Sequence, residues 1–190
     1  MKLVAFDLSL AATGYAVWDN GKLEYGTLRP PDLRGFPRLN WIRSQAANLA
    51  TGANLVIFEG ISFMSNDPGT QERIGLAFLI RYLLWHRETP FVLCAPTSLK
   101  KFVVGHAGKK DPATGEKIKV TKDLMIKELY KRFGHDVDDN NQADGIGLLY
   151  VARALVNDWQ PTTDAQRQVV EAIRKSNSGA LQEIGEKCHQ

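Results

Sequence analysis

Short, unbroken runs of apolar residues constrain the fold of this chain most. Leu55 to Phe58 is entirely apolar and ends at Glu59, and Phe91 to Cys94 is a second run of the same kind. Four apolar residues without alternation are typical of a strand that is buried on both faces, as in a parallel sheet covered by helices. A third run, Leu3 to Phe6, leads into Asp7. The chain is therefore expected to be an α/β protein.

The segments around these runs predict the remaining elements. An Asp-Asn-Gly turn at 19–21 separates two further extended segments, so we expect three antiparallel strands at the start of the chain. Helical spacing of apolar residues follows in four places. The predicted strands are 3–6, 15–18, 23–28, 55–58 and 91–94, and the predicted helices are 39–50, 70–88, 120–133 and 141–156. The expected architecture is a central five-stranded mixed sheet, three antiparallel strands and then parallel ones, flanked by helices.

Length and composition suit one globular domain with an extension. The chain has 190 residues, of which 44% are hydrophobic, enough to bury a core without disulfides. Residues 1–160 are expected to form the domain. Residues 161–190 are more polar and are expected to be a helical or flexible extension, with an amphipathic helix over 164–175. Two cysteines cannot build a disulfide framework or a Cys-rich zinc site, and no apolar run suits a signal peptide or a membrane span. A cytoplasmic protein is the default expectation.

Positive charge is concentrated in one part of the chain. The formal net charge is only +3, but residues 96–134 contain ten Lys or Arg against four acids. A basic segment beside an acidic remainder is expected of a protein that binds a phosphate backbone. A solvated, lysine-rich surface is the alternative.

The predicted helix over 70–88 is apolar on more than one side. Phe78 and Trp85 belong to one stripe, and Leu79 and Leu83 lie on the neighbouring arc. A surface helix needs one apolar face, so the second must be covered. We expect a homodimer in which this helix meets its symmetry mate, with the chain's own loops as the alternative cover.

Three acids carry the chemical signal. Asp7 and Glu59 each follow an apolar strand, and Asp144 lies near the start of an apolar helix, three residues after Asn141 on the same face. Burying an isolated carboxylate costs free energy, so acids at such positions are expected to bind cations together. Oxygen ligands of this kind suit Mg²⁺ or Mn²⁺ rather than zinc. Taken singly, each has an alternative: a turn cap for Asp7, a solvated strand end for Glu59, and a helix N-terminal charge for Asp144.

Four motifs resemble a known family. Residues 7–17 combine an acid at the end of a strand with a Gly-containing hairpin, and residues 58–64 place an acid just before an aromatic residue. Residues 96–108, followed by 122–125, form a lysine segment, and residues 141–148 form an acidic helix start. In this order and spacing the chain resembles the RuvC-type Holliday junction resolvases of the RNase H-like superfamily over residues 3 to about 156. A compact chain with an inserted basic loop would suit a resolvase of bacteriophage type.

The resemblance implies a fold and an activity. It implies an RNase H-like fold and a crossover junction endodeoxyribonuclease, a nuclease of DNA recombination and repair that cuts branched DNA at four-way junctions. It further implies two Mg²⁺ ions per active site, replaceable by Mn²⁺ and roughly 4 Å apart. Asp7 would bridge the ions, Glu59 would bind one, and Asp144 with Asn141 would hold the other. A homodimer would place two such sites for paired, symmetric nicks, in a bacterial cytosol or that of a phage-infected host.

The same resemblance implies the DNA contacts. Lys100, Lys101 and Lys122 would contact phosphates as point charges. Phe63, four residues after the second acid, would stack on an unpaired base or else fill the core.

Two features depart from the family pattern. The family usually places an acid or a His three residues before the last Asp, where this chain has the neutral Asn141, which leaves Asp138 and Asp139 as alternative ligands. An insertion at 109–117 is expected to form a turn at the tip of a basic loop, which reaches toward DNA or is a mobile surface loop. Two alternatives remain open, and the neutral Asn141 is a sign of the second alone. One is another RNase H-like nuclease that acts on branched DNA or RNA, and the other is a non-catalytic nucleic-acid-binding relative.

Overall fold

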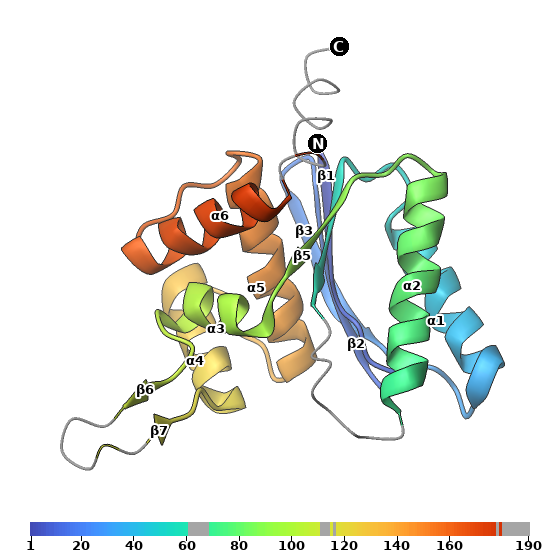
Figure 1. The fold of residues 1–190 in the computed structure, drawn as a ribbon, viewed down its shortest axis with the longest axis horizontal. Coiled ribbons are helices and arrows are strands. Elements are labelled where there is room, and N and C mark those ends of the chain that lie inside the picture. Colours follow the sequence, from blue (N-terminus) through green and yellow to red (C-terminus); the bar gives the residue numbers. More distant parts are fainter. Residues whose placement is uncertain (61–68, 111–114, 116, 178, 180–190) are drawn as a thin grey trace.

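The computed structural model describes residues 1–60, 69–110, 115, 117–177 and 179. It is an α/β arrangement in which helices cover both faces of one sheet (Figure 1). Its strands are β1 (Lys2–Asp7), β2 (Thr13–Asp19), β3 (Lys22–Leu28), β4 (Leu55–Glu59), β5 (Phe91–Cys94), β6 (Lys109–Lys110) and β7 (Lys117–Ile118). Its helices are α1 (Gly35–Leu49), α2 (Thr70–His86), α3 (Pro96–Val104), α4 (Lys122–Phe133), α5 (Asn140–Leu155) and α6 (Asp164–Ser176). No helix in the described part of the chain is long and apolar enough to cross a membrane.

The sheet has the predicted mixed topology. Its strand order is β3-β2-β1-β4-β5, in which β1, β2 and β3 are antiparallel neighbours. β4 runs parallel to β1, and β5 runs parallel to β4. Phe6 is paired with Phe58, so Asp7 and Glu59 end neighbouring parallel strands at the same edge of the sheet. The prediction of three antiparallel strands followed by parallel ones is confirmed.

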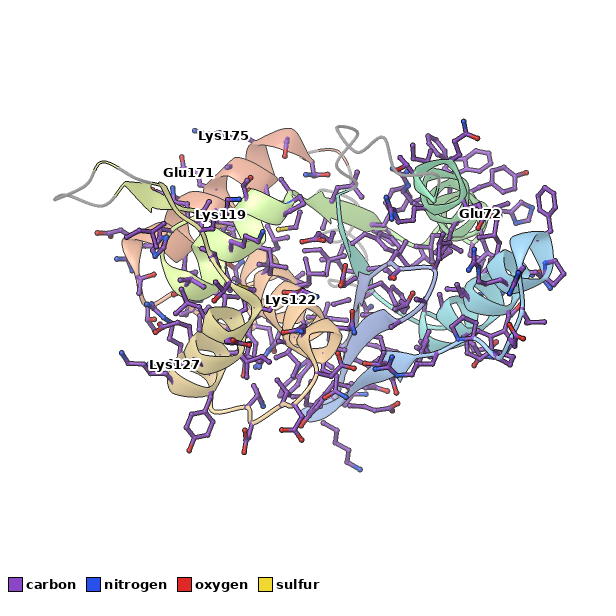
Figure 2. All side chains as sticks on the ribbon, turned by 90° about the horizontal axis from the view of Figure 1, so that it is seen from below. Glu72, Lys119, Lys122, Lys127, Glu171 and Lys175 are labelled. Carbon is purple, nitrogen blue, oxygen red and sulfur yellow. The ribbon has the colours of Figure 1, made fainter. Side chains whose placement is uncertain are left out.

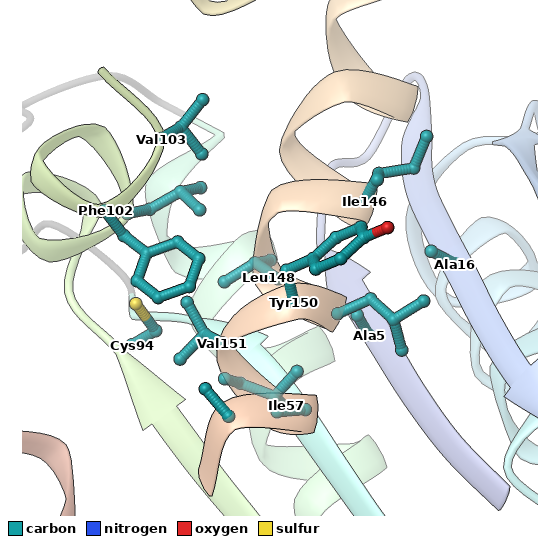
Figure 3. Packing of buried hydrophobic residues seen from close by; sticks show 14 of the residues in the cluster. Ala5, Ala16, Ile57, Cys94, Phe102, Val103, Ile146, Leu148, Tyr150 and Val151 are labelled. Carbon is teal, nitrogen blue, oxygen red and sulfur yellow. The ribbon is translucent and has the colours of Figure 1, made fainter. Parts of the chain in front are cut away.

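Unbroken apolar runs are needed because both faces of the central strands are covered. In β1, Leu3 and Ala5 point into the core on one side of the sheet, while Val4 and Phe6 point into the core on the other. Figure 1 shows α1 and α2 on the second side and α3, α4, α5 and α6 on the first. Figure 3 shows α5 packing across the sheet in the larger core, where Val151 lies close to Ile57 and Phe102.

Helix α3 is an element that the sequence pattern did not predict. It begins at Pro96, directly after β5, and ends at Gly105, whose φ of +94° favours glycine. Leu99, Phe102 and Val103 occupy one face of α3 and are fully buried. The lysine segment identified in the sequence is therefore partly a helix anchored in the larger core.

The insertion at 109–117 contains a two-stranded ladder. Lys109 pairs with Ile118 and Lys110 with Lys117, and β6 and β7 extend away from the body of the protein between α3 and α4 (Figure 1). The predicted turn at its tip lies largely outside the described residues.

Helix α6 packs onto the body of the protein. Its Val169, Val170 and Ile173 are buried in the larger core, beside α3. Thr163 and Gln166 form a capping box that sets the start of the helix. The predicted helix over 164–175 is thus observed at Asp164–Ser176.

Candidate active site at the carboxyl ends of β1 and β4

Three carboxylates from separate elements meet at one edge of the sheet. Asp7 is the last residue of β1, Glu59 is the last residue of β4, and Asp144 lies one turn into α5. A hydrogen bond joins Glu59 to Asp7, and the charge of Asp144 acts on Glu59. Asp7 and Asp144 also repel each other. The structure thus brings together the three acids that the sequence singled out.

Burial and mutual repulsion favour the protonated forms of these acids. Burial, followed by the charges of Asp7 and Asp144, raises the pKa of Glu59 to about 8. Burial, followed by the charge of Asp7, raises the pKa of Asp144 to about 7. Burial also raises the pKa of Asp7, although the hydrogen bond from Glu59 and the charge of Lys122 oppose it. The protein alone therefore does not accommodate three ionised carboxylates here at neutral pH, and an added cation would favour their ionised forms.

A cavity of about 180 Å³ lies beside the cluster. Glu59 and Asp144 line it together with Lys100 from α3 and Lys122 from α4. The charges of both lysines lower the pKa of Asp144, so both act on the acids electrostatically. A larger hollow of about 670 Å³ lies between α1 and the β2–β3 end of the sheet, but none of the three acids lines it. The small cavity, with both signs of charge, is therefore the candidate active site.

The first turn of α5 is held against β3 by Asp139. This residue caps α5, and its carboxylate accepts hydrogen bonds from Thr27 Oγ1 at 2.8 Å and Arg29 Nη2 at 2.8 Å. It also accepts bonds from the backbone N–H of Asn141 at 2.8 Å and from its Nδ2 at 2.6 Å. Burial alone would raise the pKa of Asp139, but these bonds and the charge of Arg29 hold it below its usual value. An ionised Asp139 thus ties the start of α5 to the sheet.

Close backbone contact also fixes α5. A Cβ atom added to Gly14 would lie 1.9 Å from the backbone oxygen of Asn141, and one added to Gly145 would lie 3.1 Å from the backbone of Tyr15. Glycine at these two positions lets β2 and α5 approach directly. This approach brings Asp144 to the acids of β1 and β4.

The remaining site residues from the sequence lie in different places. The Nζ of Lys101 donates a hydrogen bond to Gln168 Oε1 of α6 at 2.7 Å, whereas its neighbour Lys100 lines the cavity. Asn141 is bonded to Asp139, as described above. Phe63 lies outside the described residues.

Asn140 is a cavity residue that sequence reasoning missed. It is the first residue of α5 and lines the cavity with Glu59 and Asp144. Its Oδ1 atom is buried and has no hydrogen-bond partner in the part of the chain that the structure describes. Its spacing of four residues from Asp144 was the available signal, because residues at i and i+4 share a helix face.

The donor set suits a hard divalent cation that completes its shell from elsewhere. Among the described residues, no three His, Cys, Asp or Glu side chains lie close enough together to hold an ion by themselves. Mg²⁺ is commonly bound by one or two carboxylates, with water and substrate phosphate as the other ligands. The carboxylates of Glu59 and Asp144 and the unpartnered oxygen of Asn140 fit that pattern.

Comparison with solved structures identifies the fold. The chain superposes on RuvC of Thermus thermophilus with a TM-score of 0.58 at 14% identity, covering 83% of this chain and 97% of that one. The same RuvC in complex with a Holliday junction substrate gives a TM-score of 0.58 at 14% identity, covering 78% and 90%. The fowlpox virus resolvase with junction DNA gives 0.48 at 16% identity, covering 82% and 99%. No family model and no curated protein matches the sequence. The protein has the RuvC-like form of the RNase H-like fold, as the sequence motifs predicted.

Proposed function

We propose that this protein is a metal-dependent endonuclease that resolves four-way DNA junctions by paired, symmetric nicks. One observation carries the proposal: Asp7, Glu59 and Asp144 meet at the carboxyl ends of β1 and β4, with Lys100 and Lys122 beside them, on a RuvC-like fold. Fold alone would not support an activity, because one fold serves many functions. The grouping of carboxylates that can hold cations with lysines that can bind phosphate supports phosphodiester hydrolysis as the reaction.

The acids would hold Mg²⁺, or Mn²⁺ in its place. Asp7 and Glu59 are joined by a hydrogen bond and would share the cations between β1 and β4, while Asp144 would bind from α5. Two ions in such a site supply an acidified water for attack on phosphorus and offset the charge of the leaving oxygen. The protein's contribution is placement: two parallel strands and a capped helix hold three carboxylates that repel one another until a cation binds.

The lysines would bring the phosphate to the acids. Lys100 and Lys122 line the cavity from α3 and α4, together with Glu59 and Asp144. A phosphodiester entering the cavity would meet positive charge from these two helices and the cations on the acids. Figure 2 shows Lys119 and Lys127 on the same side of the protein as Lys122, well away from Glu72 on α2. Lys119 and Lys127 would bind the flanking DNA through its phosphate backbone. Such contacts supply affinity but carry little sequence information.

A homodimer would supply the second nick. On α2, Phe78 is 60% exposed, Tyr82 64% and Trp85 69%, while Leu76, Ala77, Ile80 and Leu84 are buried against the sheet. Exposed aromatic residues in consecutive turns are typical of an interface. A second copy of α2 across a two-fold axis would cover them, and the two active sites would then be related by the same axis. The protein would act on DNA in the cytosol of a bacterium or of an infected bacterial cell.

The dimer is tested by sedimentation velocity of wild type and Trp85→Glu. A charge on the exposed face should shift the protein to a monomer and leave each protomer folded. Wild type that sediments as a monomer at working concentrations would contradict the dimer.

The activity is tested with a labelled synthetic four-way junction and a matched linear duplex in Mg²⁺ or Mn²⁺, using wild type and Asp7→Asn. We expect paired nicks in opposing strands of the junction, little cutting of the duplex, and no cutting by the variant. Equal cutting of both DNAs would indicate a more general RNase H-like nuclease. Tight junction binding without cutting would indicate a binding protein. Either result would overturn the proposed resolvase.

A further inference from the structure

The side-chain amide oxygen of Asn140 has no hydrogen-bond partner among the described residues, and Asn140 lines the charged cavity. This Oδ1 atom is buried, and Glu59, Asp144, Lys100 and Lys122 line the same cavity. Buried polar atoms in folded proteins are nearly always paired, so an unpaired one in a polar cavity calls for a ligand. The ligand must be a hydrogen-bond donor or a cation, because an amide oxygen only accepts.

The neighbouring asparagine is already engaged elsewhere. The backbone N–H and the Nδ2 of Asn141 both donate to Asp139 Oδ1, at 2.8 Å and 2.6 Å. Asp139 is itself held by Thr27 and Arg29 of the β3 side. The two adjacent asparagines thus differ in role: Asn141 stabilises the start of α5, whereas Asn140 lines the cavity.

Asn140 also lies on the face of α5 that carries Asp144. Residues four apart on a helix are neighbours on its surface, and both residues line the same cavity. An amide oxygen beside a carboxylate is an ordinary pair of ligands for a hard divalent cation.

We propose that Asn140 supplies a neutral oxygen ligand, directly or through a bound water, to the divalent cation held by Asp144. In the same arrangement Asn141 is a positioning residue, held by Asp139. This assignment deepens the proposed nuclease function and rests on it. The site therefore contains three carboxylates and one amide, and its charge is one unit less negative than that of a site with a fourth acid.

The test is a Mn²⁺ titration by isothermal calorimetry, in parallel with thermal unfolding in the absence of metal. Asn140→Ala should weaken Mn²⁺ binding by about 10-fold or more, the range seen when a group that supports a metal ligand is lost. Its unfolding midpoint without metal should stay at or above that of wild type, because the change removes an unpaired buried oxygen. Asn140→Asp should tighten Mn²⁺ binding by about 10-fold, since it adds a carboxylate.

Asn141→Ala is the matched control. It removes one hydrogen bond to Asp139, so it should lower the unfolding midpoint without metal and change Mn²⁺ affinity less than Asn140→Ala does. Wild-type affinity in both Asn140 variants, or a larger loss of affinity in Asn141→Ala, would overturn the assignment.

The outcomes also separate this assignment from the proposed function. If wild type cleaves four-way junctions but the Asn140 variants bind Mn²⁺ as wild type does, only the assignment fails. If wild type takes up no Mn²⁺ and cuts no junction, the proposed function fails and the assignment fails with it.

Discussion

Helices α2 and α5 are both largely apolar and pack on opposite faces of the same sheet, yet they are buried to very different extents. α5 buries eleven of its sixteen residues, because β1 and β2 lie on one side of it and α3, α4 and α6 around the rest. α2 buries four of seventeen, against the sheet and α1, and leaves Phe78, Tyr82 and Trp85 exposed. The sequence of an apolar helix therefore shows that its apolar faces must be buried. The neighbouring elements in the fold decide whether the same chain buries them.

The two helices also differ in function under the proposed reaction. α5 contributes Asp144 and Asn140 to the charged cavity, so its position must be held closely, and Asp139, Gly14 and Gly145 do so. α2 contributes no residue to that cavity. Four measurements test this contrast.

The largest effect is expected from Asp144→Asn in α5. Loss of this carboxylate should reduce junction cleavage by about 10³-fold or more, the order expected when a group of the reacting site is removed. The measurement is single-turnover cleavage of a labelled junction in Mg²⁺. Asp136→Asn, which changes an exposed acid on the approach to α5, is the matched control and should cleave as wild type does. Equal losses in both variants would show that the effect is not specific to the cluster.

Next in size is the contrast between Gly14→Ala and Gly75→Ala. A Cβ at Gly14 would meet the backbone of Asn141 at 1.9 Å, so this change should force β2 and α5 apart and destabilise the fold by about 3 kcal/mol or more. A Cβ at Gly75 in α2 meets nothing within 4 Å, so that change should stabilise the helix by roughly 0.5–1 kcal/mol. Urea unfolding of the two variants measures both effects. Similar stabilities would contradict the close contact at α5.

The acid cluster should make the metal-free protein less stable as pH rises. The pKa values of Glu59, about 8, and Asp144, about 7, lie above the usual carboxyl values of about 4. Between about pH 4 and pH 8 the folded state therefore holds more protons than the unfolded state. Stability should be fully present below about pH 4 and should fall by several kcal/mol toward pH 8, because each unit by which a pKa is raised corresponds to about 1.4 kcal/mol. Thermal unfolding in a chelator across this range measures it. Glu59→Gln should flatten the slope, and Mg²⁺ should restore stability most at the high end.

The smallest effect is expected from Lys122→Ala. Loss of one phosphate contact should weaken junction binding and lower the slope of log affinity against log salt by about 1. Fluorescence anisotropy at several salt concentrations gives both values. Arg43→Ala is the control on the other side of the sheet, in α1, and should leave the slope unchanged. A larger change for Arg43→Ala would place the DNA on the α1 and α2 side.

Much of the fold was predictable because its signals are local. The unbroken apolar runs at β1, β4 and β5 and the turn at 19–21 indicated the sheet and its mixed topology. α3 was missed because its nine residues follow a strand directly and carry two lysines in a short apolar helix. Its Pro at the start and Gly at the end were the available signals.

The grouping of the three acids follows from local sequence signals. Asp7 and Glu59 end neighbouring parallel strands, and Asp144 lies one turn into a buried helix, so strand direction and helix phase predict that they lie at one edge of the sheet. The other side chains of the site are selected by tertiary packing, which the sequence pattern does not show. Lys100 lines the cavity while Lys101 bonds to Gln168 of α6, and Asn140 lines it while Asn141 bonds to Asp139. Adjacent residues point in different directions around a helix, and the exact start of α5 is set by Thr27 and Arg29, more than 100 residues away in sequence.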